Sequence, residues 1–166
     1  MKIVYCHHAL RDMGNPPTQE DGIKELGKKD AEIVAEIMAD GKVNGLNIKA
    51  IYSSPFKRCM DTANIINSEL NIPLVEEKRF NEFNKETSVK DETWIELQQR
   101  VREAIKDIVW KYDENDTVIC VTSGVNIASF ISLAYNLKPS ESTPFIGVPS
   151  CSPIVFKINK ENFKND

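Results

Sequence analysis

The sequence predicts a three-layer α/β/α sandwich with a mostly parallel central sheet. Short apolar segments typical of strands alternate with segments whose apolar residues recur every three or four positions, the pattern of amphipathic helices. The strand expected at 117–121 is almost wholly apolar, which is typical of strands buried on both faces of a parallel sheet. With 166 residues, no internal repeats and no linker, the chain is expected to form one domain over 1–166.

The first predicted strand, 2–7, ends in a pair of histidines, His7 and His8, which are the only histidines in the chain. A loop rich in turn-forming residues follows at 10–22. A helix is then predicted over about 27–40. Its expected buried stripe comprises Ala31, Val34, Ala35 and Met38, widened by Ile33 and Ile37.

The second predicted strand, 49–52, leads into Ser54 and Pro55. Serine is a favoured helix N-cap and proline suits the first helical position, so we expect a helix to start there. The inner face of this helix is expected to comprise Cys59, Thr62, Ala63, Ile66 and Leu70. A short third strand at 73–75 and a charged connection at 79–83 follow.

The longest predicted helix spans about 91–112. Its apolar positions are Trp94, Leu97, Val101, Ile105, Ile108 and Tyr112, at three- and four-residue steps. The apolar strand at 117–121 then leads into a helix over about 125–137. The tail contains two more predicted strands, 145–148 and 153–158, with at least one at an edge of the sheet.

The composition argues against nucleic-acid, metal and membrane binding. A net charge of -4, from 21 basic and 25 acidic residues, offers no excess of positive charge for a nucleic acid. The four cysteines form no CxxC pair and neither histidine has a cysteine partner at zinc-ligand spacing, so we expect buried reduced thiols and no metal or other cofactor. No signal peptide is visible and no run approaches ~20 apolar residues, so a cytoplasmic protein without a membrane partner is expected.

Polar side chains follow three of the predicted strands at their carboxyl ends. Right-handed crossovers bring these ends to one edge of a parallel sheet, where such folds bind ligands. Histidine and arginine can donate to an anion, and the N-terminus of a following helix attracts negative charge. The residues are His7 and His8 after the first strand, Ser53, Ser54 and Arg58 after the second, and Thr122, Ser123 and Gly124 after the apolar one. The pattern therefore predicts a phosphate site.

Each of these signals also has a purely structural explanation. The histidine pair could end an edge strand in solvent, and Arg58 could be a solvated surface side chain. Ser123 with Gly124 could form only a tight turn and a helix cap. Glu82 is one of many acidic residues and stands out only through its neighbours.

A cysteine phosphatase is excluded by spacing. That chemistry needs a fixed separation between the nucleophilic cysteine and an arginine. After Cys6, the arginine Arg11 comes one residue too early, and Asp12 occupies the required position.

The segment 51–63 reads Ile-Tyr-Ser-Ser-Pro-Phe-Lys-Arg-Cys-Met-Asp-Thr-Ala. Over its whole length it resembles the strand, Ser-Ser-Pro, Arg and Thr-Ala pattern of the histidine phosphatase superfamily, the phosphoglycerate-mutase-like enzymes. Further segments are similar to motifs of that family in the same order, namely Leu26-Gly27 followed by Ala31, Arg79-Phe80-Asn81-Glu82, and Val121-Thr122-Ser123-Gly124. The resemblance covers about 1–137 and identifies the chain as a divergent short member with that family's fold.

The resemblance implies a role for each residue of the predicted site. His8 would be the nucleophile that takes up the phosphoryl group, and Arg58 would hold the phosphate oxygens. Glu82 would be the general acid that protonates the leaving oxygen, and then the base that activates water. The phosphate-binding residues would be His7, Arg58, Ser123, Gly124 and Asn15, the last lying one place away from the family's substrate-binding asparagine.

Two positions of the site depart from the family pattern. His7 stands where the family has its first arginine, and Ser123 stands where it has its second histidine. Ala9 also replaces a glycine. Histidine lacks the bidentate fork of arginine, and a neutral hydroxyl donates a weaker hydrogen bond than a charged group. Activity is therefore expected to be weakened unless Arg11 or Lys57 compensates.

Two functions follow from the resemblance. The first is a phosphomonoester hydrolase that acts through a phosphohistidine intermediate on a small phosphorylated metabolite or a phosphoprotein. The short connection between Glu82 and the next helix leaves little material for a substrate lid, which favours a phosphatase over a mutase. The alternative is a catalytically degenerate member that binds a phosphorylated ligand without turnover.

Overall fold

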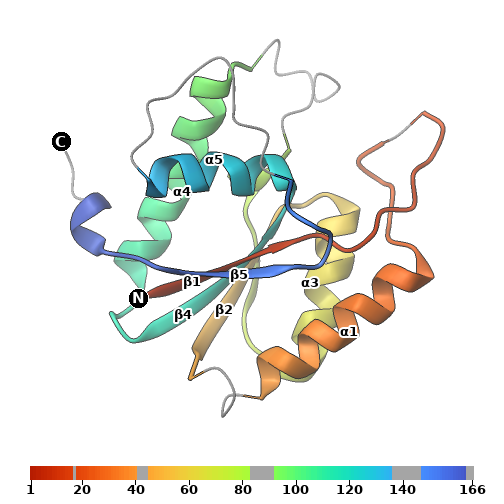
Figure 1. Ribbon diagram of the computed structural model, residues 1–166, viewed down its shortest axis with the longest axis horizontal. Coiled ribbons are helices and arrows are strands. Elements are labelled where there is room, and N and C mark those ends of the chain that lie inside the picture. The colour runs from red at the N-terminus through yellow and green to blue at the C-terminus, as the bar shows by residue number, and fades with distance from the viewer. Residues whose placement is uncertain (17, 41–44, 83–91, 136–146, 164–166) are drawn as a thin grey trace.

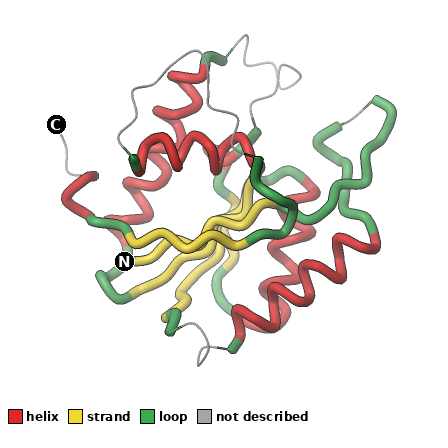
Figure 2. Tube along the Cα trace, in the orientation of Figure 1, coloured by secondary structure: helices red, strands yellow, loops and turns green. Residues whose placement is uncertain are grey.

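Helices lie on both faces of a central sheet, which confirms the predicted three-layer α/β/α architecture (Figure 1, Figure 2). One face is covered by α1 (Glu25–Ala39) and α3 (Lys57–Leu70), and the other by α4 (Trp94–Lys111) and α5 (Gly124–Ala134). This arrangement comes from a computed structural model, which describes residues 1–16, 18–40, 45–82, 92–135 and 147–163.

The five-stranded sheet has the order β3-β2-β4-β1-β5. Its strands are β1 (Lys2–His7), β2 (Asn47–Ser53), β3 (Leu74–Glu76), β4 (Asp116–Thr122) and β5 (Pro153–Lys157). Every neighbouring pair is parallel except β1 with β5, so the prediction of a mostly parallel sheet is confirmed. β5 lies at an edge, and β4 lies at the centre, which explains why the sequence of β4 is almost wholly apolar.

Alternate side chains of each central strand enter two different cores, because successive residues of a strand point to opposite faces. In β1, Ile3 and Tyr5 pack toward α4 and α5, whereas Val4 and Cys6 pack toward α1 and α3. The Tyr5 ring lies with its centroid 4.6 Å from that of Phe130 in α5. The sheet is therefore held from both sides, and its strand ends are rigidly placed.

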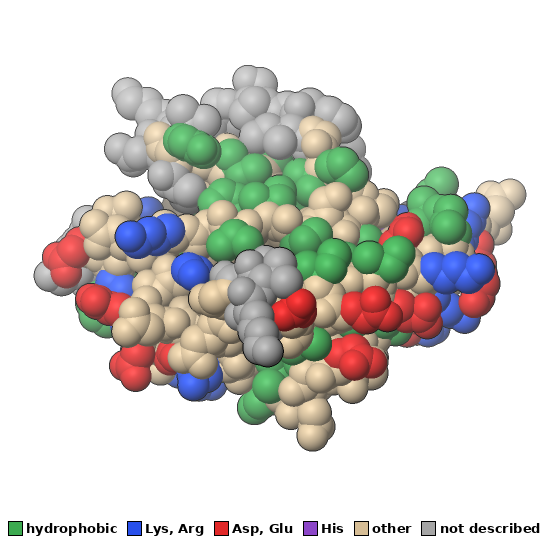
Figure 3. Space-filling model, turned by 60° about the horizontal axis from the view of Figure 1, so that its bottom comes forward, with side chains coloured by type: hydrophobic (Ala, Val, Ile, Leu, Met, Phe, Trp, Pro, Cys, Tyr) green, Lys and Arg blue, Asp and Glu red, His purple; other side chains and the backbone are tan. Residues whose placement is uncertain are grey.

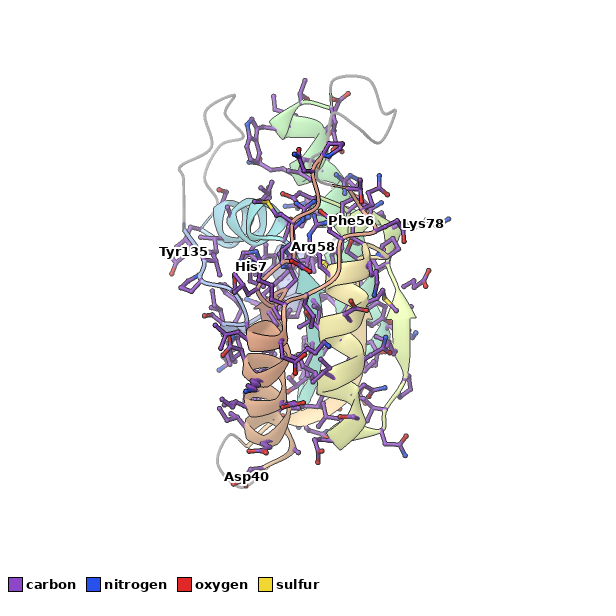
Figure 4. All side chains as sticks on the ribbon, turned by 90° about the vertical axis from the view of Figure 1, so that its right-hand side faces the viewer. His7, Asp40, Phe56, Arg58, Lys78 and Tyr135 are labelled. Carbon is purple, nitrogen blue, oxygen red and sulfur yellow. The ribbon has the colours of Figure 1, made fainter. Side chains whose placement is uncertain are left out.

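The predicted stripe of α1 is narrower than the sequence suggests. Ala31, Val34, Ala35 and Met38 are buried as expected. Ile33 and Ile37, however, are 55% and 44% exposed, so their assignment to the buried face is wrong. The reason is that α1 packs with one side against α3, beside which it lies in Figure 4, and Ile33 and Ile37 lie on its other side.

The helix after β2 begins later than predicted. α3 starts at Lys57, so the assignment of Ser54 as its N-cap and of Pro55 as its first residue is wrong. The Ser54 backbone N–H instead donates to the Val121 carbonyl of β4 at 3.0 Å, and the Ser54 hydroxyl donates to Asn81 Oδ1 at 3.0 Å. Tertiary bonds thus keep Ser54 extended beyond the end of β2.

Other element ends differ by a few residues from the predicted ones. α4 begins at Trp94 because Thr93 and Glu96 form a capping box at its start. The short 3₁₀-helices η1 (Lys78–Phe80) and η2 (Lys160–Phe163) were not expected. Gly147 and Val148 are not in a strand, and the rest of the strand predicted at 145–148 lies outside the described residues, as does the predicted end of the helix at 136–137.

All four cysteines are buried and free, in agreement with the expectation of reduced thiols. Within the described ranges, no helix has both the length and the apolar character required to cross a membrane. Acidic and basic side chains are interspersed on the face shown in Figure 3.

The loop that follows β1 lies directly against α1 at Gly27. A Cβ atom at this position would lie 2.8 Å from Leu10 N and 2.9 Å from Leu10 O. We expect Gly27→Ala to lower the free energy of unfolding by about 1–3 kcal/mol, because both atoms belong to the backbone and cannot easily move. Elsewhere in a helix the same change would raise the free energy of unfolding by about 1 kcal/mol. Urea denaturation measures the difference.

Gly22→Ala is the matched control. The nearest atom to its added Cβ would be Asp61 Oδ2 at 2.9 Å, which is the tip of a side chain and can turn away. The free energy of unfolding should therefore change little. Equal effects of the two substitutions would contradict a specific contact at Gly27.

Candidate active site

The carboxyl ends of the parallel strands lie together at one edge of the sheet. Beyond the paired strands, His8 N donates to the Thr122 carbonyl at 2.9 Å, and Glu77 N donates to the Ser53 carbonyl at 2.8 Å. These bonds extend the ladder into the loops that carry the predicted site residues. In Figure 4, His7 and Arg58 lie near the upper ends of α1 and α3, whereas Asp40 lies at the lower end of α1.

His8 is buried and has its Nε2 atom directed at Arg58. Arg58 Nε donates to His8 Nε2 at 3.2 Å, and His8 Nδ1 lies 2.8 Å from the Ala9 carbonyl oxygen. A carbonyl can only accept, so Nδ1 carries the ring hydrogen and Nε2 has a lone pair. Burial, together with smaller contributions from the neighbouring His7 and Arg58, lowers the pKa of His8 to about 3, although the bond to the Ala9 carbonyl opposes this shift. His8 is therefore neutral at pH 7, with a nucleophilic nitrogen next to a cation.

The backbone on both sides of this contact is tied together by Thr62 of α3. Its hydroxyl donates to the Arg58 carbonyl at 2.7 Å and accepts a bond from Ala9 N at 2.9 Å. Ala9 is fully buried, so the replacement of the family's glycine is accommodated in the core. These bonds hold the loop of His8 against the helix that carries Arg58.

Arg58 is only 2% exposed, so the alternative of a solvated surface arginine is wrong. Its Nη2 donates to Glu82 Oε2 in an ion pair, and its guanidinium carbon lies 4.9 Å from the centre of the Phe56 ring. The guanidinium thus joins His8, in the loop directly after β1, to Glu82 beyond β3. The structure brings together all three residues for which the sequence predicts a catalytic role.

His7 is held by its own hydrogen bond rather than by the other site residues. Its Nδ1 donates to the Val148 carbonyl at 2.7 Å, and its ring centroid lies 4.5 Å from that of His8. Burial is the main cause that lowers the pKa of His7 below 6.5, although backbone bonds to Val148 and Pro149 oppose it. His7 is therefore neutral at pH 7 and does not supply the charge of the arginine that it replaces.

Ser123 and Gly124 lie at the start of α5, beside His7. Ser123 is 3% exposed and its Oγ accepts a hydrogen bond from Asn126 at 3.2 Å. A Cβ at Gly124 would lie 3.4 Å from His7 Cε1, so the absence of a side chain there lets the His7 ring sit close to the helix. Gly124 thus lies against His7, and Ser123 lies immediately before it at the start of α5.

Asn15, Arg11 and Lys57 lie apart from the His8–Arg58 contact. Asn15 is exposed in the loop at 10–22, which projects away from the sheet (Figure 1). Arg11 pairs with Asp21 at 2.7 Å, and Lys57 pairs with Asp61 at 2.8 Å. The two cations expected to compensate for His7 and Ser123 are therefore each bound to a carboxylate.

Two residues support the site from behind, of which the sequence analysis named Thr122 and missed Asn126. Thr122 Oγ1 and Asn126 Nδ2 both donate to the Phe80 carbonyl, at 2.8 and 2.9 Å. The signal available in the sequence for Asn126 was an amide side chain in the first turn of a largely apolar helix. Among the residues that the structure describes, no group of three or more His, Cys, Asp or Glu side chains is placed to hold a metal ion.

Comparison with protein families gives a match for most of the chain. The family model described as histidine phosphatase superfamily (branch 1) matches residues 17–88 and 83–165. No curated protein matches the sequence.

Several solved structures have a similar fold. YhfR of Bacillus stearothermophilus is 18% identical with a TM-score of 0.76, and the match covers 95% of this chain and 91% of YhfR. A mycobacterial glucosyl-3-phosphoglycerate phosphatase is 17% identical with a TM-score of 0.72, covering 93% and 88%. The protein histidine phosphatase SixA, solved with tungstate, is 13% identical with a TM-score of 0.70, covering 98% and 91%. At such low identity these likenesses establish the fold.

The lowered pKa of His8 predicts how the protein loses stability in acid. Above pH 6.5 the ring is neutral in both the folded and the unfolded chain. As the pH falls from 6.5 toward about 3, the unfolded chain takes up a proton that the folded chain does not. The free energy of unfolding should therefore fall by up to about 1.4 kcal/mol per pH unit in this window.

His8→Gln is the matched variant, because it removes the titrating group and keeps a side chain that can donate to the Ala9 carbonyl. Urea denaturation of both proteins between about pH 7 and about pH 4.5 gives the two pH profiles. The wild type should lose stability more steeply than the variant. Parallel profiles would show that the pKa of His8 is not lowered.

Proposed function

Because this chain belongs to the histidine phosphatase superfamily, we propose that it is a phosphomonoester hydrolase that works through a phosphohistidine at His8. The observation that carries the proposal is the buried, neutral His8, whose Nε2 lone pair lies 3.2 Å from Arg58 Nε. A nucleophile and the cation that stabilises developing negative charge are therefore in contact before the substrate arrives.

In the first step, His8 Nε2 attacks phosphorus and the bond from phosphorus to the leaving oxygen breaks. The phosphate oxygens compete with Glu82 for the Arg58 guanidinium. Freed from its cation and next to a new negative charge, the Glu82 carboxylate takes up a proton more readily, and it can then give this proton to the leaving oxygen. The bond from His8 Nδ1–H to the Ala9 carbonyl stabilises the positive ring that forms.

In the second step, water replaces His8 on phosphorus. The Glu82 carboxylate takes a proton from the water as its oxygen attacks, and the bond between phosphorus and Nε2 breaks. Inorganic phosphate leaves and His8 returns to its neutral form. Glu82 then releases its proton to solvent and pairs again with Arg58, which restores the contacts of the free protein.

We expect turnover to be slow for the family. Phosphoryl transfer depends mainly on positioning and on positive charge around the phosphate oxygens. Here His7 is neutral and Ser123 offers a neutral hydroxyl in place of the family's second histidine. The loss of one oxyanion donor commonly costs about 10²–10³ in rate, and two such losses need not add.

The substrate class that we propose is a small phosphorylated metabolite or a phosphoprotein. The similar folds include a mycobacterial glucosyl-3-phosphoglycerate phosphatase and the protein histidine phosphatase SixA, so both substrate classes are supported. The connection after Glu82 that favours a phosphatase over a mutase falls on 83–91, outside the described residues.

The second candidate function is binding of a phosphorylated ligand without turnover. The lowered pKa of His7 is the observation that favours it, because the pocket then offers less positive charge than the family pattern. Binding needs only Arg58 and hydrogen-bond donors, whereas transfer also needs a stabilised transition state.

The test of the catalytic role is His8→Ala assayed with a panel of phosphate monoesters. Wild type should hydrolyse at least one ester, and the variant should lose this activity by at least about 10³-fold, because no other group supplies the nucleophile. Inorganic phosphate binding, measured by calorimetry, should persist in the variant because Arg58 remains. Activity that survives in His8→Ala would contradict the mechanism, and phosphate binding without any turnover by wild type would favour the second function.

The state of His7 predicts a distinctive pH dependence. Protonated His7 can donate from Nε2 to a phosphate oxygen, whereas neutral His7 presents a lone pair there. We expect the ratio of kcat/KM for wild type to that for His7→Gln to rise as the pH falls below 6.5 toward about 4.5. The ionisation of the substrate cancels in this ratio. A ratio that does not change with pH would show that His7 contributes no charge.

A further inference from the structure

One buried side chain bonds to both halves of the site. Asn126 is 0% exposed and lies in the first turn of α5. Its Nδ2 atom lies 2.9 Å from the Phe80 carbonyl, 3.0 Å from the Asn81 carbonyl and 3.2 Å from Ser123 Oγ. Phe80 and Asn81 immediately precede Glu82, and Ser123 is the residue in place of the family's second histidine.

The orientation of this amide follows from its partners. Backbone carbonyls can only accept hydrogen bonds, so the NH₂ group of Asn126 must face Phe80 and Asn81. Its Oδ1 atom is buried, and none of the described residues bonds to it. Such an unpaired oxygen is unfavourable for stability, and an apolar side chain would avoid it. We therefore explain the presence of an amide at position 126 by the backbone segment that its NH₂ group holds in place.

The bonds of Asn126 fix the backbone that carries Glu82. Arg100 bonds to the same segment from its exposed side. Its Nη1 donates to the Arg79 carbonyl at 2.6 Å and to the Asn81 carbonyl at 3.0 Å. Asn126 grips it from the interior. The segment is thus held between α4 and α5, which places the Glu82 carboxylate on Arg58.

The bond from Asn126 also affects the hydrogen-bonding role of the Ser123 hydroxyl. Because Ser123 Oγ accepts from Asn126, its own hydrogen is left to be donated. A phosphate at His8 would offer an acceptor. Asn126 is itself fully buried and does not touch the substrate.

We propose that Asn126 is a positioning residue that sets both the general acid Glu82 and the phosphate donor Ser123. This inference rests on the proposed function and names a residue that acts through two others. It predicts that loss of the Asn126 amide impairs proton delivery to the leaving group and weakens anion binding together.

The test compares leaving groups in Asn126→Ala. Hydrolysis of an alkyl phosphate needs a proton on the leaving oxygen, whereas the phenolate of p-nitrophenyl phosphate leaves almost without one. We expect kcat/KM, which reports the step in which the leaving group departs, to fall about 100-fold or more for the alkyl ester and less than about 10-fold for the aryl ester. Equal losses on the two esters would overturn the role in positioning Glu82. Tungstate should bind the variant several-fold more weakly by calorimetry, and unchanged binding would overturn the role of Ser123.

Two further variants separate positioning from general damage. Ser132→Ala, in the same helix, removes a hydroxyl that bonds to the Ala128 carbonyl and should leave both kcat/KM values unchanged. Arg100→Met releases the segment from its exposed side only. We expect it to slow the alkyl ester selectively while tungstate binding stays unchanged, because Arg100 has no bond to Ser123 in the described structure. If Arg100→Met lowered the rates on both esters equally, the proposal that Arg100 and Asn126 together hold the segment before Glu82 would be contradicted.

A measurement without turnover keeps the inference separate from the proposed function. Amide hydrogen exchange in residues 78–82 should accelerate at least about 10-fold in Asn126→Ala, because the segment loses its inner anchor. Exchange in β1 and β4 should not change. An unchanged exchange rate in 78–82 would overturn the inference even if wild type proved to be an active phosphatase. A faster exchange rate would support the role of Asn126 in holding this segment even if no ester were hydrolysed.

Discussion

The buried guanidinium of Arg58 sets the requirements that its surroundings meet. A cation at 2% exposure loses most of its hydration, and the effective penalty is several kcal/mol unless polar partners replace the water. Glu82 supplies a carboxylate, His8 supplies a lone pair and Phe56 supplies an aromatic face. Each partner comes from a different part of the chain. The packing of the loops around this cation is therefore what turns separate strand ends into a site.

The same contact explains the resting state of the candidate nucleophile. A protonated His8 would repel Arg58, so the cation and burial together keep the ring neutral and leave Nε2 with its lone pair. The Arg58–Glu82 pair occupies the donors that a phosphate would use. In the proposed mechanism, a phosphate displaces the carboxylate from Arg58 and gains the cation. In this mechanism, a single guanidinium therefore links the binding of phosphate to the release of the proposed acid, Glu82.

The pocket differs from the family pattern mainly in its charge. His7 is neutral and bound to Val148, and the nearby cations Arg11 and Lys57 are paired with Asp21 and Asp61. The site therefore depends on accurate placement of a few donors more than on an excess of positive charge. The rigid supports behind it, in which Thr62, Thr122 and Asn126 bond to loop backbone, are consistent with that dependence.

The sequence by itself determined the layers, the parallel sheet and the placement of His8 and Arg58 at one edge, because strand and helix periodicity and the handedness of crossovers depend on local pattern and chain order. Glu82 was predicted to join them only through the resemblance to the histidine phosphatase family. The errors of the sequence-based prediction lay where distant residues compete for the same groups. Ser54 is held by Val121 and Asn81 instead of capping α3, and the side chains of Ile33 and Ile37 are largely exposed instead of buried. Only the tertiary structure decided the burial of Arg58, the neutral state of His7 and the contacts of Asn126. These depend on bonds between residues far apart in the chain, which no local pattern encodes.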